Sequence, residues 1–391
     1  MTFLPLSPNG APRGFRKSRS GSTPAPPLPS PAVPTTDAPL SSGAGSLDEI
    51  PTAGEKSKPS PWFLMIWCVF LLVSADASAA PGQGPLRVRN YHPPHLMFLM
   101  PAPAAPWDGK AGEWELTPGV AYAASFVNED SERWRTVIDL EMTVLEFGLT
   151  AGLSRRLSLG AEVRFASMSG GFLDGFLEDF HDAFGLPNYG RELRPKNEFL
   201  YFIEKDGEQW LESEFGGLHL VDPSLSLEYL LTDRGDPRGP EGRFTASLSY
   251  ALKLPLGDET AGFGSGELDH RVAAPLRWIG DPFALYLVPS FSILSDPDTL
   301  GADIRVRNVF GTFLSAEWAF ARHWSVLAGL NFYTSPFEAT GIEQFDDDTF
   351  QLDAGMIWSP APDLRLEFSF SEDLAPPAPD FALRMGLGYR F

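Results

Sequence analysis

An acidic stretch at residues 170–188, GGFLDGFLEDFHDAFGLPN, carries the side chains of this sequence best suited to hold a ligand. Its apolar residues recur at three- and four-residue intervals, which predicts a short helix that Gly185 can end. One helical turn separates Asp174 from Glu178 and Glu178 from Asp182, so a hard cation such as Ca²⁺ could bridge them. The simpler interpretation, which we favour, is a solvated polar face above an apolar stripe, and no metal is assigned. The full candidate set for a cation or gating site is Asp174, Glu178, Asp179, His181 and Asp182.

A second group of charged and polar residues falls on alternate positions of the downstream segments. Alternate positions of a strand share one face, so these side chains are expected to face a common lumen. Both signs are present, whereas a ring of one sign would indicate ion selectivity. The mixture fits either a polar pore for small solutes or a lumen closed by salt bridges. The predicted lumen-facing residues are Glu162, Arg164, Glu228, Arg243, Lys253, Glu267, Asp269, Arg271, Arg277, Glu317, Asn331, Asp353, Arg365, Glu367, Arg384 and Arg390.

The histidines show no catalytic pattern. None lies in a Gly-x-Ser-x-Gly lipase signature, and the sequence has no phosphate loop, zinc spacing or dinucleotide fingerprint. His270 falls on an apolar face, where interfacial stacking is expected rather than catalysis. We therefore predict no catalytic residue and no cofactor, with a lipid-hydrolysing barrel as the alternative.

The segments that position these residues alternate with a period of two. From Phe381 to Phe391, large apolar residues occupy every odd position, and small or charged ones the even positions. About twelve such segments predict an all-β fold, a transmembrane antiparallel β-barrel, because twelve strands enclose too wide a lumen to fill with apolar side chains. The alternation in 134–153 changes face, which predicts a bulge near Thr143. The predicted strands are 114–127, 134–153, 157–167, 218–232, 242–256, 266–279, 283–294, 306–321, 324–335, 349–359, 364–371 and 380–391.

The connections alternate between short and long, as in barrels with short periplasmic turns and longer external loops. The longest connection, 168–217, is rich in aromatic residues, which are expected to be buried. We predict that this external loop folds down over the mouth as a cap or plug, with the short helix at its centre.

The first eighty residues differ from the rest. Residues 1–60 are rich in Pro and Ser and are predicted to be a disordered extension or a wrongly assigned start. Residues 56–79, with an apolar run at 62–73 that includes the single cysteine, Cys68, read as a signal peptide cleaved near Ala79. The remaining assignments are a periplasmic segment at 80–112 and a barrel at 113–391, located in the bacterial outer membrane.

The stretch at 170–188, together with GPLRVRN at 84–90, resembles an uncharacterised family of outer-membrane proteins, domain of unknown function 3187. The resemblance implies the location and the barrel fold, and it implies no activity. Tyr389 and Phe391 resemble the terminal signal that the barrel assembly machinery reads in such proteins.

Composition narrows the function further. The mean hydropathy is −0.10 although 43% of residues are hydrophobic, so apolar residues are diluted by polar ones throughout the chain. A net charge of −21 argues against a nucleic acid partner. We predict a passive channel or binding barrel for a small solute, embedded in outer-membrane lipid, with a lipid-acting enzyme or a purely structural barrel as alternatives.

Overall fold

The computed structural model describes residues 81–185, 188, 190–213, 215–297, 303–375 and 377–391. The extension predicted at 1–60, the signal peptide at 56–79 and the cleavage site near Ala79 lie outside the described residues. They remain predictions.

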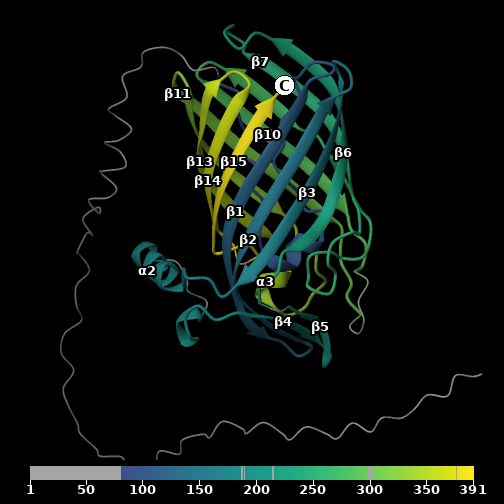
Figure 1. Ribbon diagram of the computed structural model, residues 1–391, viewed down its shortest axis with the longest axis vertical. Helices are drawn as coiled ribbons and strands as arrows, with labels where there is room; N and C mark the ends of the chain where they lie inside the picture. Colours follow the sequence, from purple (N-terminus) through teal and green to yellow (C-terminus); the bar gives the residue numbers. More distant parts are fainter. Residues whose placement is uncertain (1–80, 186–187, 189, 214, 298–302, 376) are drawn as a thin grey trace, which may run out of the picture. The chain divides into compact units, whose positions relative to one another are not determined.

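Twelve antiparallel wall positions, which we call staves, close into a barrel; each stave is one strand or two strands in line. This confirms the predicted fold class (Figure 1). β1 pairs with β2 on one side and with β15 on the other, so the sheet closes on itself. β8 and β9 form one stave interrupted at 274–275, since both pair with β7 and β10. The staves are β1 (Trp114–Asp130), β2 (Trp134–Gly152), β3 (Leu157–Ser169), β6 (His219–Gly235), β7 (Arg243–Lys253), β8 (Asp269–Ala273) with β9 (Leu276–Gly280), β10 (Phe283–Ile293), β11 (Val309–Ala321), β12 (Trp324–Tyr333), β13 (Thr349–Ala361), β14 (Leu364–Asp373) and β15 (Phe381–Arg390).

The remaining elements are short. The long loop between β3 and β6 contains helix α2 (Asp174–Phe184), the 3-10 turn η2 (Arg191–Leu193) and the hairpin of β4 (Leu200–Lys205) and β5 (Glu208–Glu212). β4 pairs with the first residues of β2, so the hairpin extends the wall beyond the barrel rim. η1 (Pro93–Met97) precedes the barrel and α3 (Glu343–Asp346) lies between β12 and β13. The predicted loop helix is therefore present as α2.

The two ends of the barrel differ. At one end, which we call the turn end, lie the short connections, the start of β1 and the C-terminal Phe391. At the other, the loop end, lie the long connections together with α2, α3 and the β4–β5 hairpin, at the bottom of Figure 1.

The outer wall is apolar. Phe147, Leu285 and Phe368 are 46%, 46% and 47% exposed and point away from the lumen. A band of such side chains around a closed barrel is the surface that a bilayer covers. Among the residues that the structure describes, none of the helices is long and apolar enough to cross a membrane.

The predicted bulge near Thr143 is wrong. β2 pairs with β1 and with β3 in unbroken register through this position. The apolar side chains change face because their surroundings change along the strand. Ile138 and Met142 point into the lumen and pack in a buried cluster with Tyr91, whereas Phe147, nearer the turn end, faces lipid.

Candidate functional site

The lumen holds residues 81–112, which we call the plug segment. It starts at the turn end, where the backbone amide of Gly84 donates to Glu317 at 3.2 Å. It runs to η1 near the loop end and returns, so that the amide of Trp107 meets Glu228 at 2.8 Å before β1 begins. The sequence places 80–112 in the periplasm as a segment separate from the barrel. The structure instead lays most of residues 81–112 inside the barrel, with 110–112 exposed at the turn end, because the buried polar and apolar groups of the segment find partners on the inner wall.

Glycines in the wall make room for this segment. A Cβ atom built on Gly311 of β11 would lie 2.7 Å from the Cβ of Pro101, closer than real side chains approach. A Cβ on Gly355 of β13 would lie 3.0 Å from Leu86. The wall therefore carries glycine where side chains of the plug segment pack closest to it.

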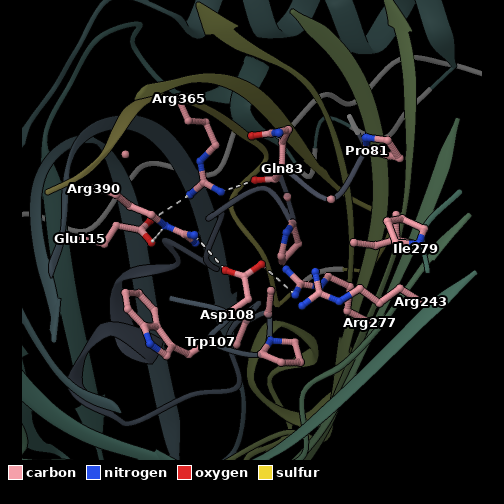
Figure 2. A pocket seen from close by; sticks show the side chains of 18 of the residues that line it. Pro81, Gln83, Trp107, Asp108, Glu115, Arg243, Arg277, Ile279, Arg365 and Arg390 are labelled. Atoms are coloured by element: carbon pink, nitrogen blue, oxygen red, sulfur yellow. Dashed lines mark hydrogen bonds and ion pairs between the residues drawn. The ribbon is translucent and has the colours of Figure 1, made fainter. Parts of the chain in front are cut away.

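At the turn end, an ionic network ties both ends of the plug segment to the wall (Figure 2). Asp108 lies 3.0 Å from Arg277 and 2.9 Å from Arg390. Glu115 pairs with Arg390 at 3.0 Å, with Arg365 at 3.7 Å and also with Arg87. Two carboxylates thus hold four guanidinium groups drawn from the plug, β9, β14 and β15.

A cavity of about 550 Å³ lies beside this network. The two ends of the plug segment, 81–85 and 103–108, line it together with turn residues of the barrel. Arg238, Asp281 and Asp363 belong to the lining and are exposed, so the cavity opens to solvent at the turn end.

A second cavity of about 200 Å³ lies deeper, between the plug segment and the wall. Arg87, Pro103 and Thr150 line both cavities, so the two adjoin. We call the deeper one the arginine cavity. Its charged lining residues are Arg87, Arg89, Arg271, Arg384, Glu146 and Glu162.

Near the loop end, wall side chains form hydrogen bonds with the plug backbone at 97–100, and we call this group of contacts the grip. Lys253 donates to the carbonyl of Met97 at 2.7 Å, and Asp269 accepts from the amide of Leu99 at 2.9 Å. Ser292 donates to the carbonyl of Leu99 at 2.6 Å. Arg271 donates to the carbonyl of Met100 at 2.6 Å. Lys253 is buried and also lies 2.9 Å from Asp222 and 3.2 Å from Asp269.

Beyond this grip, apolar side chains close the loop end of the lumen. Phe337 packs against Phe98, Trp210 and Phe345 with ring centroids 6.1, 6.0 and 4.9 Å apart. The members come from the plug segment, the β4–β5 hairpin and the loop with α3. We call this group the closure cluster; its residues are Tyr91, Leu96, Phe98, Tyr201, Trp210, Phe337 and Phe345.

Two imidazoles are buried at the closure cluster. His92 and His95 are each 1% exposed, with their rings 5.2 Å apart. Neither ring nitrogen of His92 has a hydrogen-bond partner among the described residues. Burial lowers the pKa of His92 to about 3, so the docked ring is neutral.

The acidic loop residues do not converge on a common point. Asp174 is buried and accepts from Arg191 and from the amide of Asn197, both at 2.6 Å. Glu178 pairs with Lys196 at 2.6 Å. Asp182 accepts from Asn188 at 3.2 Å, and His181 meets the same amide side chain at 3.1 Å. Asp179 is exposed. In the described part of the chain, no group of three His, Cys, Asp or Glu residues is arranged to hold a metal, so the cation site remains a prediction.

Helix α2 does not cap the mouth. Its Leu177 is buried against Ala124 and Phe381, which point outward from the barrel, and its Phe176 ring lies 5.7 Å from that of Phe381. The predicted cap is therefore wrong for the helix: its apolar stripe packs on the outer wall over β1, β14 and β15. Only the β4–β5 part of the same loop joins the closure cluster.

Most of the predicted lumen-facing residues lie on the inner wall, and the structure joins several of them into networks. Arg384 is buried and donates to Glu146 at 2.6 Å and to Glu367 at 2.7 Å. Asp353 accepts from Gln351 and Ser371 on the inner wall. Arg243 lies at the turn end, 2.7 Å from Asp233. Glu267 differs, since it is exposed in the loop before β8.

The predicted assembly residues close the seam at the turn end. The backbone of Phe391 exchanges two hydrogen bonds with Trp114, both at 2.9 Å, and its ring stacks on Tyr389 at 5.8 Å. Phe391 is 61% exposed on the outer surface.

Sequence reasoning missed the plug residues, Arg87, Arg89 and Asp108 among them. A signal was present. The run HLMFLM at 95–100 is too apolar for a segment exposed to the periplasm, and its proline-rich flanks exclude a wall strand.

A family model described as "Protein of unknown function (DUF3187)" matches residues 62–391. The chain belongs to this family. The structure is the β-barrel that the resemblance implied, and its outer-membrane location remains a prediction. A search of curated proteins found no match to the sequence.

Several solved outer-membrane proteins are similar over most of the chain. The COG4313 outer membrane channel from Pseudomonas putida F1 has 14% identity and a TM-score of 0.48, over 75% of this chain and 98% of that one. The CymD monoaromatic hydrocarbon channel has 13% identity and a TM-score of 0.34, over 72% and 88%. The KdgM porin, solved with disordered oligogalacturonate, has 8% identity and a TM-score of 0.36, over 71% and 99%. At these values we carry over neither solute nor mechanism.

Proposed function

We propose that the protein is an outer-membrane channel for a small solute and that the plug segment is its gate. The observation that supports this most is how the plug is held. No residue of 81–112 joins a strand of the wall. Besides the backbone hydrogen bond from the amide of Gly112 to the carbonyl of Gly152 on β2, the segment is held by side-chain hydrogen bonds, ion pairs and apolar packing. The polar contacts can be exchanged for water one at a time.

The polar lumen favours a channel over a purely structural barrel. Buried charges and unfilled space both cost free energy, so a barrel that serves only stability gains nothing by keeping them in its lumen. The turn-end part of this lumen contains cavities of about 550 and 200 Å³ bordered by arginines and carboxylates. Such a lining favours water and polar solutes in these cavities.

Passage requires the plug to move at the loop end. Both cavities lie on the turn-end side of the closure cluster, and the described residues of that cluster are tightly packed aromatic and aliphatic side chains. Four of its members belong to the β4–β5 hairpin and the α3 loop, and three belong to the plug segment. Withdrawal of 91–98 would therefore open the cluster without unpairing any wall strand.

A reversible cross-link tests the gate. The expected mature chain has no cysteine, so the variant Pro101→Cys/Gly311→Cys would carry the only thiols. Built on Gly311, a Cβ lies 2.7 Å from that of Pro101, and a disulfide needs about 3.5–4.5 Å, so a shift of about 1 Å in the plug permits the bond. In planar bilayers, the reduced protein is expected to show open events that oxidation abolishes and reduction restores. Each single-cysteine variant serves as control.

A plug deletion supplies the second arm. Residues 85 and 106 line the same cavity, so a short Gly-Ser linker can replace 86–105 without straining the barrel. This variant is expected to be folded, as judged by a heat-modifiable gel shift, and to conduct continuously. A folded deletion variant without conductance would overturn the proposal and favour a binding or structural barrel.

A further inference from the structure

The arginine cavity has an excess of positive charge inside an acidic protein. Its lining contains four arginines, Arg87, Arg89, Arg271 and Arg384, and two glutamates, Glu146 and Glu162. The whole chain carries 51 acidic and 30 basic residues, so the charge excess at this cavity is opposite in sign to the net charge of the chain.

The carboxylates near the cavity are shared among arginines. Glu162 pairs with Arg89 and lies 3.3 Å from Arg164. Glu115, which pairs with Arg87, is also shared with Arg365 and Arg390. Arg384, by contrast, pairs with both Glu146 and Glu367, so the excess of positive charge lies with Arg87, Arg89 and Arg271.

Arg271 is the clearest case. Its one hydrogen bond to a described residue is the 2.6 Å contact from Nη1 to the carbonyl of Met100. Within the described ranges, no carboxylate oxygen lies within the 4.0 Å that defines the ion pairs of this structure. The rest of its guanidinium fork borders a cavity of about 200 Å³ together with Arg89 and Arg384.

We propose that the arginine cavity binds a small oxyanion, a solute bearing a carboxylate or phosphate group. Guanidinium groups present paired N–H donors that match both groups, and partial burial strengthens each contact. The volume admits an anion of a few carbon atoms and excludes an oligosaccharide. The cavity adjoins the larger one through Arg87, Pro103 and Thr150, so the anion reaches it from the turn end. Binding of the anion can be measured with the plug segment in place, so it does not depend on the proposed channel. Only transport of the anion rests on the proposed function.

The test is calorimetric titration of the purified full chain in detergent with succinate and with inorganic phosphate, and with glycerol as the uncharged probe. We expect saturable binding of at least one anion and none of glycerol. Arg271→Gln is expected to weaken binding at least tenfold. Arg135→Gln, at an arginine 63% exposed at the loop end, should bind as the wild type does.

The outcomes separate the two proposals. A folded wild-type protein that binds neither anion, or an Arg271→Gln variant with unchanged affinity, overturns the oxyanion site and leaves the channel untouched. Anion binding that depends on Arg271, combined with a plug-deleted barrel that never conducts, supports the site and overturns the channel. Phosphate binding without succinate binding, or the reverse, assigns the anion class.

Discussion

The most decisive test of the lumen's energetics is the replacement of Lys253 by methionine. Methionine keeps the length of the side chain but removes the charge that lies between Asp222 and Asp269 and the donor that holds the carbonyl of Met97. All three side chains of this ion group are at most 1% exposed. The free energy lost on removal of the lysine should therefore be that of a buried ion pair rather than that of a surface pair.

The expected cost follows from these distances. At an effective dielectric constant of about 20, the Lys253 contacts to Asp222 at 2.9 Å and Asp269 at 3.2 Å are worth about 6 and 5 kcal/mol of Coulomb energy. Removing the lysine also recovers its own desolvation penalty of several kcal/mol. The net loss expected for a broken buried pair is about 3–5 kcal/mol.

Arg243→Met is the matched control, because Arg243 lies at the other end of the same strand. Its pair with Asp233 is 2.7 Å long, yet the side chains are 28% and 37% exposed. Solvent screening should limit its loss to less than about 1 kcal/mol.

The assay is denaturant unfolding in detergent, followed by the heat-modifiable gel shift. Adding Asp269→Asn to Lys253→Met should recover part of the lost stability, since one unpaired carboxylate is removed. If Lys253→Met is no more destabilising than Arg243→Met, the buried network does not hold the lumen, and the reasoning on the grip at 97–100 fails with it.

Three further predictions concern assembly, pH and the long loop. Phe391→Asp, which keeps the two backbone hydrogen bonds to Trp114, should lower the folded yield in cells several-fold while refolding in detergent stays unchanged, because the ring is exposed and adds little stability; equal yields in cells would contradict an assembly signal. Acidification from pH 7.5 to 4.5 should expose the plug segment to protease, because the pKa of His92 is about 3 when docked and about 6.5 in water. The docked plug is most stable above pH 6.5, and the free energy that His92 contributes to docking falls by about 3 kcal/mol at pH 4.5. A His92→Phe variant with an undiminished pH response would refute the assignment. Deleting 170–190 should leave single-channel conductance unchanged, because α2 packs on the outer wall. A rise in conductance would show that this part of the loop covers the mouth after all.

The barrel could be predicted from the sequence alone. Period-two alternation is a local property of each strand, and it placed twelve staves and the inward or outward direction of residues such as Arg384 and Phe368. It succeeded because lipid outside and polar groups inside impose the same pattern along every stave. It failed at 134–142, where the inner surroundings become apolar and the pattern inverts without any bulge.

What fills the lumen depends on contacts that exist only in the folded barrel. The partners of Arg87, Asp108 and Leu99 lie on strands far along the chain, and no local periodicity encodes such contacts. Alternation likewise could not say whether the apolar stripe of α2 turns inward to the mouth or outward to the wall. Both outcomes bury the same side chains, and the choice depends on Phe381 and Ala124 of strands that meet only when the barrel closes.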